Sequence, residues 1–277
     1  MPAASIAQAL PYVNWILLVA LALGSFGLVA VLGQVTDATR GYLGFTAVCA
    51  AILAGIALVA DLALPATSGL TIRPAPSELD LARRVGLVAF IVLALVYATF
   101  LRREGRRLRL AVGTGIAAAA TLVAAAAGWA PSLVDSVPLL VQLVVLAAAA
   151  GGALASVILG HWYLVTPRIS ERPLVLAARL LTGVVALQLA LFVVWTTLGG
   201  GPGQLAFDAF SGGPVLFVIL RLVVSLLFAV VLSYMAIRTA ETRSMESATG
   251  LLYIDLAAIL AGTIGAAALY LSAGLLV

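Results

Sequence analysis

Long stretches of Ala, Leu and Val, separated by short groups of arginine, proline and glycine, make up most of the chain. A helix needs about 20 consecutive apolar residues to cross a bilayer. Cutting the sequence at its charges, prolines and glycine-rich breaks gives eight such runs, and none shows the alternation of a transmembrane strand. The runs cover residues 12–34, 42–64, 85–101, 110–129, 138–165, 174–198, 215–238 and 251–276. The pattern predicts an all-α, polytopic integral membrane protein, a single domain that is a bundle of eight transmembrane helices.

The composition agrees with this pattern. Of the 277 residues, 64% are hydrophobic and 9% are charged, with a mean hydropathy of +1.21, whereas about a quarter of a soluble domain is charged. We therefore expect a multi-pass protein of the cell membrane, either a plasma or an inner membrane, surrounded by the lipid bilayer and without a nucleic-acid partner. All 15 basic residues are arginine, which excludes Schiff-base cofactors and a Walker-type lysine.

The chain has one cysteine and one histidine. An internal disulfide, an iron–sulfur cluster, a bis-histidine haem and a histidine-rich metal site therefore cannot be assembled from this chain alone. We expect no metal and no covalently bound cofactor, which leaves a quinone and lipids as the ligands to consider. The first residues, Met1–Ser5, lack the basic region of a secretory signal, so the first apolar run is expected to be a retained helix.

The arginines are distributed unequally between alternate loops. If the N-terminus lies outside, the inner loops and helix ends hold most of them, and the positive-inside rule then puts both termini on the non-cytoplasmic side. The inner set is Arg40, Arg102, Arg103, Arg106, Arg107, Arg109, Arg168, Arg172, Arg238 and Arg243, and the outer set is Arg73, Arg83 and Arg84.

Two loops and several clusters of small residues add detail. The longest loop starts at Pro65, contains Pro74 and is expected to be irregular, and Ser77 is predicted to cap the third helix with acids in its first turn. Small residues from Ala147 to Ala153 permit close helix packing. The hexapeptide Ala-Ala-Ile-Leu-Ala-Gly occurs in the second and the eighth run; it is interpreted either as a relic of a repeat or, the favoured interpretation in a chain so rich in Ala and Leu, as chance.

Ionisable residues inside spans are costly and mark candidate functional sites. Asp61 is expected near enough to the outer end to be solvated, and Arg179 near enough to the inner end to extend its guanidinium to the interface. Arg221 lies deeper and needs a partner, so Arg221 and Asp61 are candidates for an intramembrane ion pair, with Asp208 as the other acid. Asp255 is interpreted either as a structural pair with Arg179 or as part of a proton-handling or quinone site.

The only histidine lies in the stretch Gly160–Pro167, between a glycine and two aromatic residues. One interpretation is an aromatic belt at the membrane boundary, in which Trp162 and Tyr163 are ordinary members. The other is a quinone or proton site on the cytoplasmic side, with a single haem contact shared with another chain as a weaker variant. The candidate residues of that site are His161, Tyr163, Arg179, Tyr253 and Asp255. Gln188 and Gln142 are expected to join helices.

Three functions remain open. The first is a membrane-embedded subunit of a larger electron-transport or respiratory assembly, without a metal cofactor of its own, that contributes a quinone or proton site and binds other membrane subunits. The second is a stand-alone transporter or channel for small solutes, although such proteins place polar groups near the midplane, and here most ionisable groups lie near span ends. The third is a purely structural subunit. Enzymatic activity of the isolated chain is the least favoured, since no catalytic cluster can be argued.

Overall fold

The computed structural model describes residues 3–67, 69–73, 75–166 and 169–277, and all regular structure in these residues is helical. Eight helices are long and apolar enough to cross a membrane, as the sequence predicts. Six of them and the last are continuous: Ala3–Val35 (α1), Arg40–Leu62 (α2), Ser77–Thr99 (α3), Glu104–Trp129 (α4), Leu133–Val165 (α5), Arg172–Leu198 (α6) and Met245–Ala273 (α9). The seventh span combines Val215–Leu220 (α7), the π-helical segment Arg221–Phe228 (η2) and Ala229–Glu241 (α8), and a single 3-10 turn, Asp208–Phe210 (η1), precedes it.

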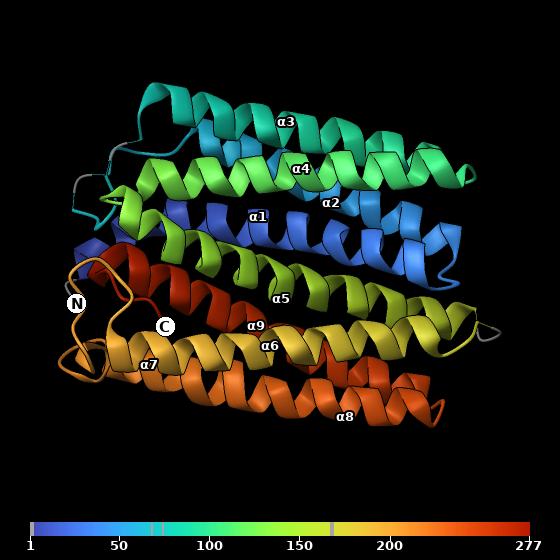
Figure 1. Ribbon diagram of the computed structural model, residues 1–277. Coiled ribbons are helices and arrows are strands. Elements are labelled where there is room, and N and C mark those ends of the chain that lie inside the picture. Colours follow the sequence, from blue (N-terminus) through green and yellow to red (C-terminus); the bar gives the residue numbers. More distant parts are fainter. Residues whose placement is uncertain (1–2, 68, 74, 167–168) are drawn as a thin grey trace.

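The helices lie side by side in an elongated bundle (Figure 1). In the first half of the chain α1 packs on α2, α2 on α3 and α3 on α4, and in the second half α5 packs on α6, α6 on α8 and α8 on α9. The halves meet mainly through α1 and α5, and α4 also contacts α5 just as α9 contacts α1. Successive spans therefore pack on one another within each half of four spans.

The contact between α1 and α5 is made by backbone as much as by side chains. A Cβ atom on Gly24 would overlap the carbonyl oxygen of Ala147, and one on Gly151 would overlap the backbone of Gly24 and Ser25. The hydroxyl of Ser25 donates to the carbonyl oxygen of Gly151 at 3.1 Å. Small residues thus bring the two central helices together, as the cluster around Ala147 to Ala153 predicts.

Helix α3 begins eight residues before the predicted boundary at residue 85, at Ser77, and Ser77 is the first helical residue after the cap position, which is held by Pro76. The predicted capping role of Ser77 is therefore wrong, whereas the acidic first turn is present as Glu78 and Asp80. Both termini lie at one end of the bundle (Figure 1), called the terminal end below; the other is the opposite end. Which end faces the cytoplasm stays a prediction, and Pro74, Pro167 and Arg168 lie outside the described residues.

Candidate functional site

A buried charge cluster joins α2 to α3 at the terminal end. Asp61 lies one residue before the end of α2 and is fully buried. Its carboxylate accepts hydrogen bonds from Arg83 Nε at 2.6 Å and Nη2 at 3.1 Å, and from Arg84 Nε at 2.7 Å. Nη1 of Arg83 lies 2.8 Å from Oδ1 of Asp80. Two carboxylates therefore face two guanidinium groups, and the cluster carries no net charge.

Two tryptophans from other helices enclose Arg83. Its guanidinium lies 5.5 Å from the ring centroid of Trp15 on α1 and 4.9 Å from that of Trp129 on α4. The two rings pack edge to face, with their centroids 4.8 Å apart. Cation–π contacts of this kind are worth about 2 kcal/mol where the cation is desolvated. Because the cluster connects all four helices of the first half and its charges are balanced, we assign it a structural role.

This cluster corrects two expectations about Asp61. The residue is not solvated at the interface, because two arginines and the surrounding helices bury it completely. The proposed pair of Asp61 with Arg221 is also wrong, since the two residues lie in different halves and Asp61 is bound to α3. Sequence reasoning placed Arg83 and Arg84 among the outer arginines without a role. The available signal was the spacing of three residues between Asp80 and Arg83, which puts both on one helix face.

Arg221 lies at the same number of residues from the start of its span as Arg83 does. Each lies six residues after the start of the third span of its half, Val215 for Arg221 and Ser77 for Arg83. Arg221 is 3% exposed, and its Nη2 donates to Oε1 of Gln188 on α6 at 2.7 Å. No carboxylate among the described residues forms an ion pair with it. The alternative partner Asp208 instead accepts from the backbone N–H of Leu205, so the predicted ion pair of Arg221 is not formed with either acid.

Gln188 connects three elements. Its Nε2 donates to the carbonyl oxygen of Val145 on α5 at 2.7 Å while its Oε1 accepts from Arg221. The amide is thereby oriented, and the expectation that Gln188 joins helices is confirmed. Gln142 likewise donates across the bundle, to the carbonyl oxygen of Val277 at 3.3 Å.

Asp255 is fully buried on α9, and neither of its carboxylate oxygens has a hydrogen-bond partner in the described structure. It lies ten residues after the start of α9, about 15 Å along the helix axis. The predicted pair with Arg179 is wrong. Arg179 is exposed and its Nη2 donates to Glu241 at the end of α8 at 2.8 Å, because the α6 face that carries it points away from the bundle interior.

None of the five residues proposed as a quinone or proton site forms a hydrogen bond or an ion pair with another of the five in the described part of the chain. His161 and Tyr253 are exposed, Tyr163 and Asp255 are buried, and Arg179 is bound to Glu241. The hydroxyl of Tyr163 donates to the carbonyl oxygen of Ser170 at 2.5 Å. Tyr163 also borders a cavity of about 360 Å³ together with residues 243–246 of the loop before α9 and its first turn, which is the feature nearest to the predicted site.

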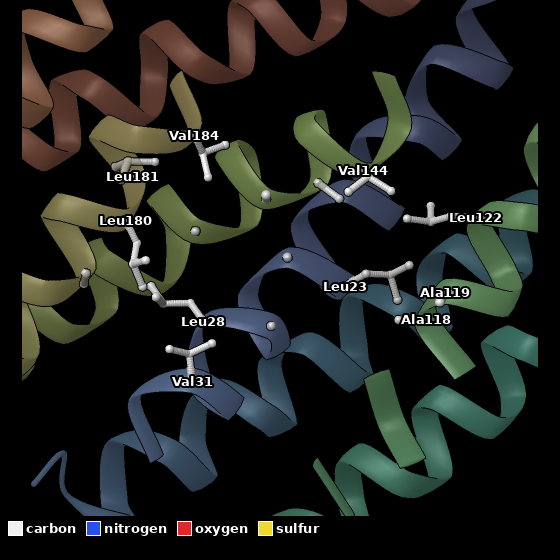
Figure 2. Close-up of a pocket in the computed structure, with 16 residues that line it drawn as sticks. Leu23, Leu28, Val31, Ala118, Ala119, Leu122, Val144, Leu180, Leu181 and Val184 are labelled. Atoms are coloured by element: carbon white, nitrogen blue, oxygen red, sulfur yellow. The ribbon is translucent and has the colours of Figure 1, made fainter. Parts of the chain in front are cut away.

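A second cavity, also of about 360 Å³, is an apolar groove in the side of the bundle (Figure 2). Every residue that lines it is Ala, Gly, Leu or Val. Helices α1 and α5 contribute small residues such as Gly27 and Ala148 together with larger ones such as Leu23, and α4 and α6 contribute Leu122 and Leu180 on either side. Leu180 is 38% exposed, so the groove opens on the outer surface of the bundle. We call this feature the α4–α6 groove.

The groove lies where the two halves are packed differently. Helix α9, the last span of the second half, packs along α5, whereas α4, the last span of the first half, makes only limited contact with α1. Space is therefore left beside α1 on this face.

No group of three or more His, Cys, Asp or Glu side chains within the described ranges is arranged to hold a metal ion. Comparison of the chain with protein-family models, with curated proteins and with solved structures finds no match.

Proposed function

We propose that this protein is a membrane-embedded subunit of a larger assembly, and that the α4–α6 groove receives a transmembrane helix of another subunit. The observation that supports this proposal is the groove itself, which is apolar, open on the outer surface of the bundle and lined by Gly and Ala together with Leu and Val (Figure 2). Apolar surface alone does not drive helices together in lipid, but close van der Waals packing over small residues does.

The dimensions of the groove agree with a helix as its occupant. On α1 the lining runs from Leu23 to Val31, a rise of about 12 Å, or roughly two helical turns. On α5 the lining includes Ala148 and Gly152, a small-xxx-small spacing that lets a neighbouring backbone approach closely. Larger side chains on α4 and α6 would then pack against both sides of the inserted helix.

The transporter alternative is less well supported by the packing of the two halves. Transporters with internal repeats alternate between states by moving one repeat against the other. Here Gly24 and Gly151 hold α1 and α5 in backbone contact, and such an interface has no room to open on either side of a polar site. We therefore favour the subunit over the transporter. A plasma or an inner membrane is the proposed location.

Among assemblies, an electron-transport complex is the class that the sequence favours, with the metal centres on other subunits. A quinone site around His161 and Tyr163 remains a prediction, and the cavity beside Tyr163 is its structural support. It is tested by His161→Ala in the isolated assembly. Unchanged quinone affinity and quinol turnover in that variant would contradict the assignment.

The proposal is tested by extracting the affinity-tagged protein from its native membrane in a mild detergent and measuring the particle mass. We expect a particle well above 28.3 kDa plus its detergent, containing at least one further membrane protein in fixed ratio. Haem or iron–sulfur absorption in that particle would support the electron-transport class. A monodisperse particle of this chain alone, stabilised by a small solute, would contradict the proposal and favour the transporter.

A further inference from the structure

A small pocket lies between the seventh span and α9, separate from the α4–α6 groove. Its volume is about 170 Å³, and Arg221 and Ser225 of η2 line it together with Gly262 and Gly265 of α9. The apolar residues at its mouth, Phe217, Leu220 and Val224, are 45%, 47% and 36% exposed. The pocket therefore opens toward the lipid and has a guanidinium group in its wall.

The guanidinium is only partly satisfied. Nη2 of Arg221 is bound to Gln188, but its Nε is buried and has no hydrogen-bond partner in the described structure. Unlike Arg83, which is equally buried and faces two carboxylates, Arg221 faces a neutral amide. A buried cation without a counter-charge is costly unless other groups hydrogen-bond to it.

Two local features place the side chain of Arg221 beside the pocket. A Cβ atom on Gly262 would overlap the side chain of Ser225 and crowd Nη1 of Arg221, so glycine is required there for α9 to pass. The pocket also lies at the junction where α7 continues into the π-helical segment η2. A π-helical conformation is frequent at functional sites. Arg221 lies about 9 Å along the span from its terminal end, six residues at 1.5 Å each.

We propose that this pocket binds the oxygen-bearing head group of a lipid-soluble ligand, and that Arg221 donates hydrogen bonds to that oxygen. The ligand enters from the bilayer, because the mouth is lined by Phe217, Leu220 and Val224. Its head group is a hydrogen-bond acceptor, since a guanidinium has donors only. A quinone carbonyl and the phosphate of an anionic phospholipid share this chemistry. The proposal does not depend on the function assigned to the α4–α6 groove.

The test uses the full chain, stripped of lipid in detergent, and two probes: a decyl-substituted benzoquinone and dioctanoyl phosphatidylglycerol. Each probe is titrated while the thermal unfolding midpoint is followed, because a ligand that binds the folded state raises it with concentration. Saturable stabilisation by the benzoquinone identifies a quinone as the ligand, and saturable stabilisation by the phosphatidylglycerol identifies an anionic phospholipid.

Variants decide whether the bound probe occupies this pocket. Gly265→Leu places an apolar side chain in the pocket, and a Cβ atom at this position meets nothing within 4 Å. Gly250→Leu, at an equally open position on the same helix, is the matched control. We expect binding to weaken about tenfold or more in Gly265→Leu and in Arg221→Met, as loss of a charged hydrogen-bond donor implies, and to be unchanged in Gly250→Leu. Absence of saturable binding of both probes, or equal binding by Gly265→Leu and Gly250→Leu, would overturn the proposal.

Discussion

Gly24 of α1 and Gly151 of α5 meet backbone to backbone at the centre of the bundle, where neither position has room for a Cβ atom. We expect Gly151→Ala to destabilise the protein by about 1–3 kcal/mol or more, because overpacking at a rigid contact forces the backbones apart. The measurement is the thermal unfolding midpoint in detergent. Gly183→Ala on α6 is the control, since an added Cβ atom meets nothing within 4 Å; it should be neutral or stabilising by up to about 1 kcal/mol. Equal midpoints for the two variants would contradict the close packing.

The charge cluster of the first half predicts a large effect at Asp61. In Asp61→Asn the guanidinium of Arg83 stays buried with part of its counter-charge removed, and breaking a buried pair in this way costs about 3–5 kcal/mol. The free energy of unfolding in mixed micelles measures the loss. Glu241→Gln breaks the ion pairs of Arg179 and Arg238, whose side chains are 60% and 67% exposed, and should cost less than about 1 kcal/mol. A cost at Asp61 as small as that at Glu241 would show that the cluster does not stabilise the fold.

The same substitution at the other buried aspartate is expected to behave differently. Asp255 has no hydrogen-bond partner on either oxygen, so Asp255→Asn removes no bond and replaces an ionisable group by a neutral one of similar shape. We expect the free energy of unfolding to stay within about 1 kcal/mol of the wild type, or to rise. A loss comparable to that of Asp61→Asn would mean that Asp255 binds a cation or a polar group in the folded protein.

The eight spans were predictable because each run of apolar residues reaches the length of a bilayer. The boundary at residue 85 was less accurate, because Asp80 and Arg83 interrupt the apolar run, and the burial of Arg83 depends on its pairing with Asp61 in another helix. A hydropathy scale gives the free-energy cost of placing a charged residue in a membrane, but it contains no information about a partner residue in another helix.

For the candidate site, the sequence likewise predicts some features, whereas others arise only when the helices pack together. The depth of Arg221 and its need for a partner followed from its position in the seventh run, but the partner turned out to be Gln188 and not an acid. The groove had no sequence signal of its own. Gly24 and Ala147 line the groove and also form the close contact between α1 and α5, so the residue types on these helices do not distinguish the groove from the closed interface.

The central claim, that the α4–α6 groove receives a helix of another subunit, is tested most directly at Gly27. An added Cβ atom there meets nothing within 4 Å, so Gly27→Leu places a side chain in the groove, and an unchanged thermal unfolding midpoint checks that the fold is intact. Gly115→Leu on α4, an equally open position outside the groove, is the matched control. The measurement is the ratio of co-purifying membrane protein to this chain after extraction from native membranes. We predict that the ratio falls to near zero in Gly27→Leu and equals that of the wild type in Gly115→Leu. An unchanged ratio in Gly27→Leu would contradict the account.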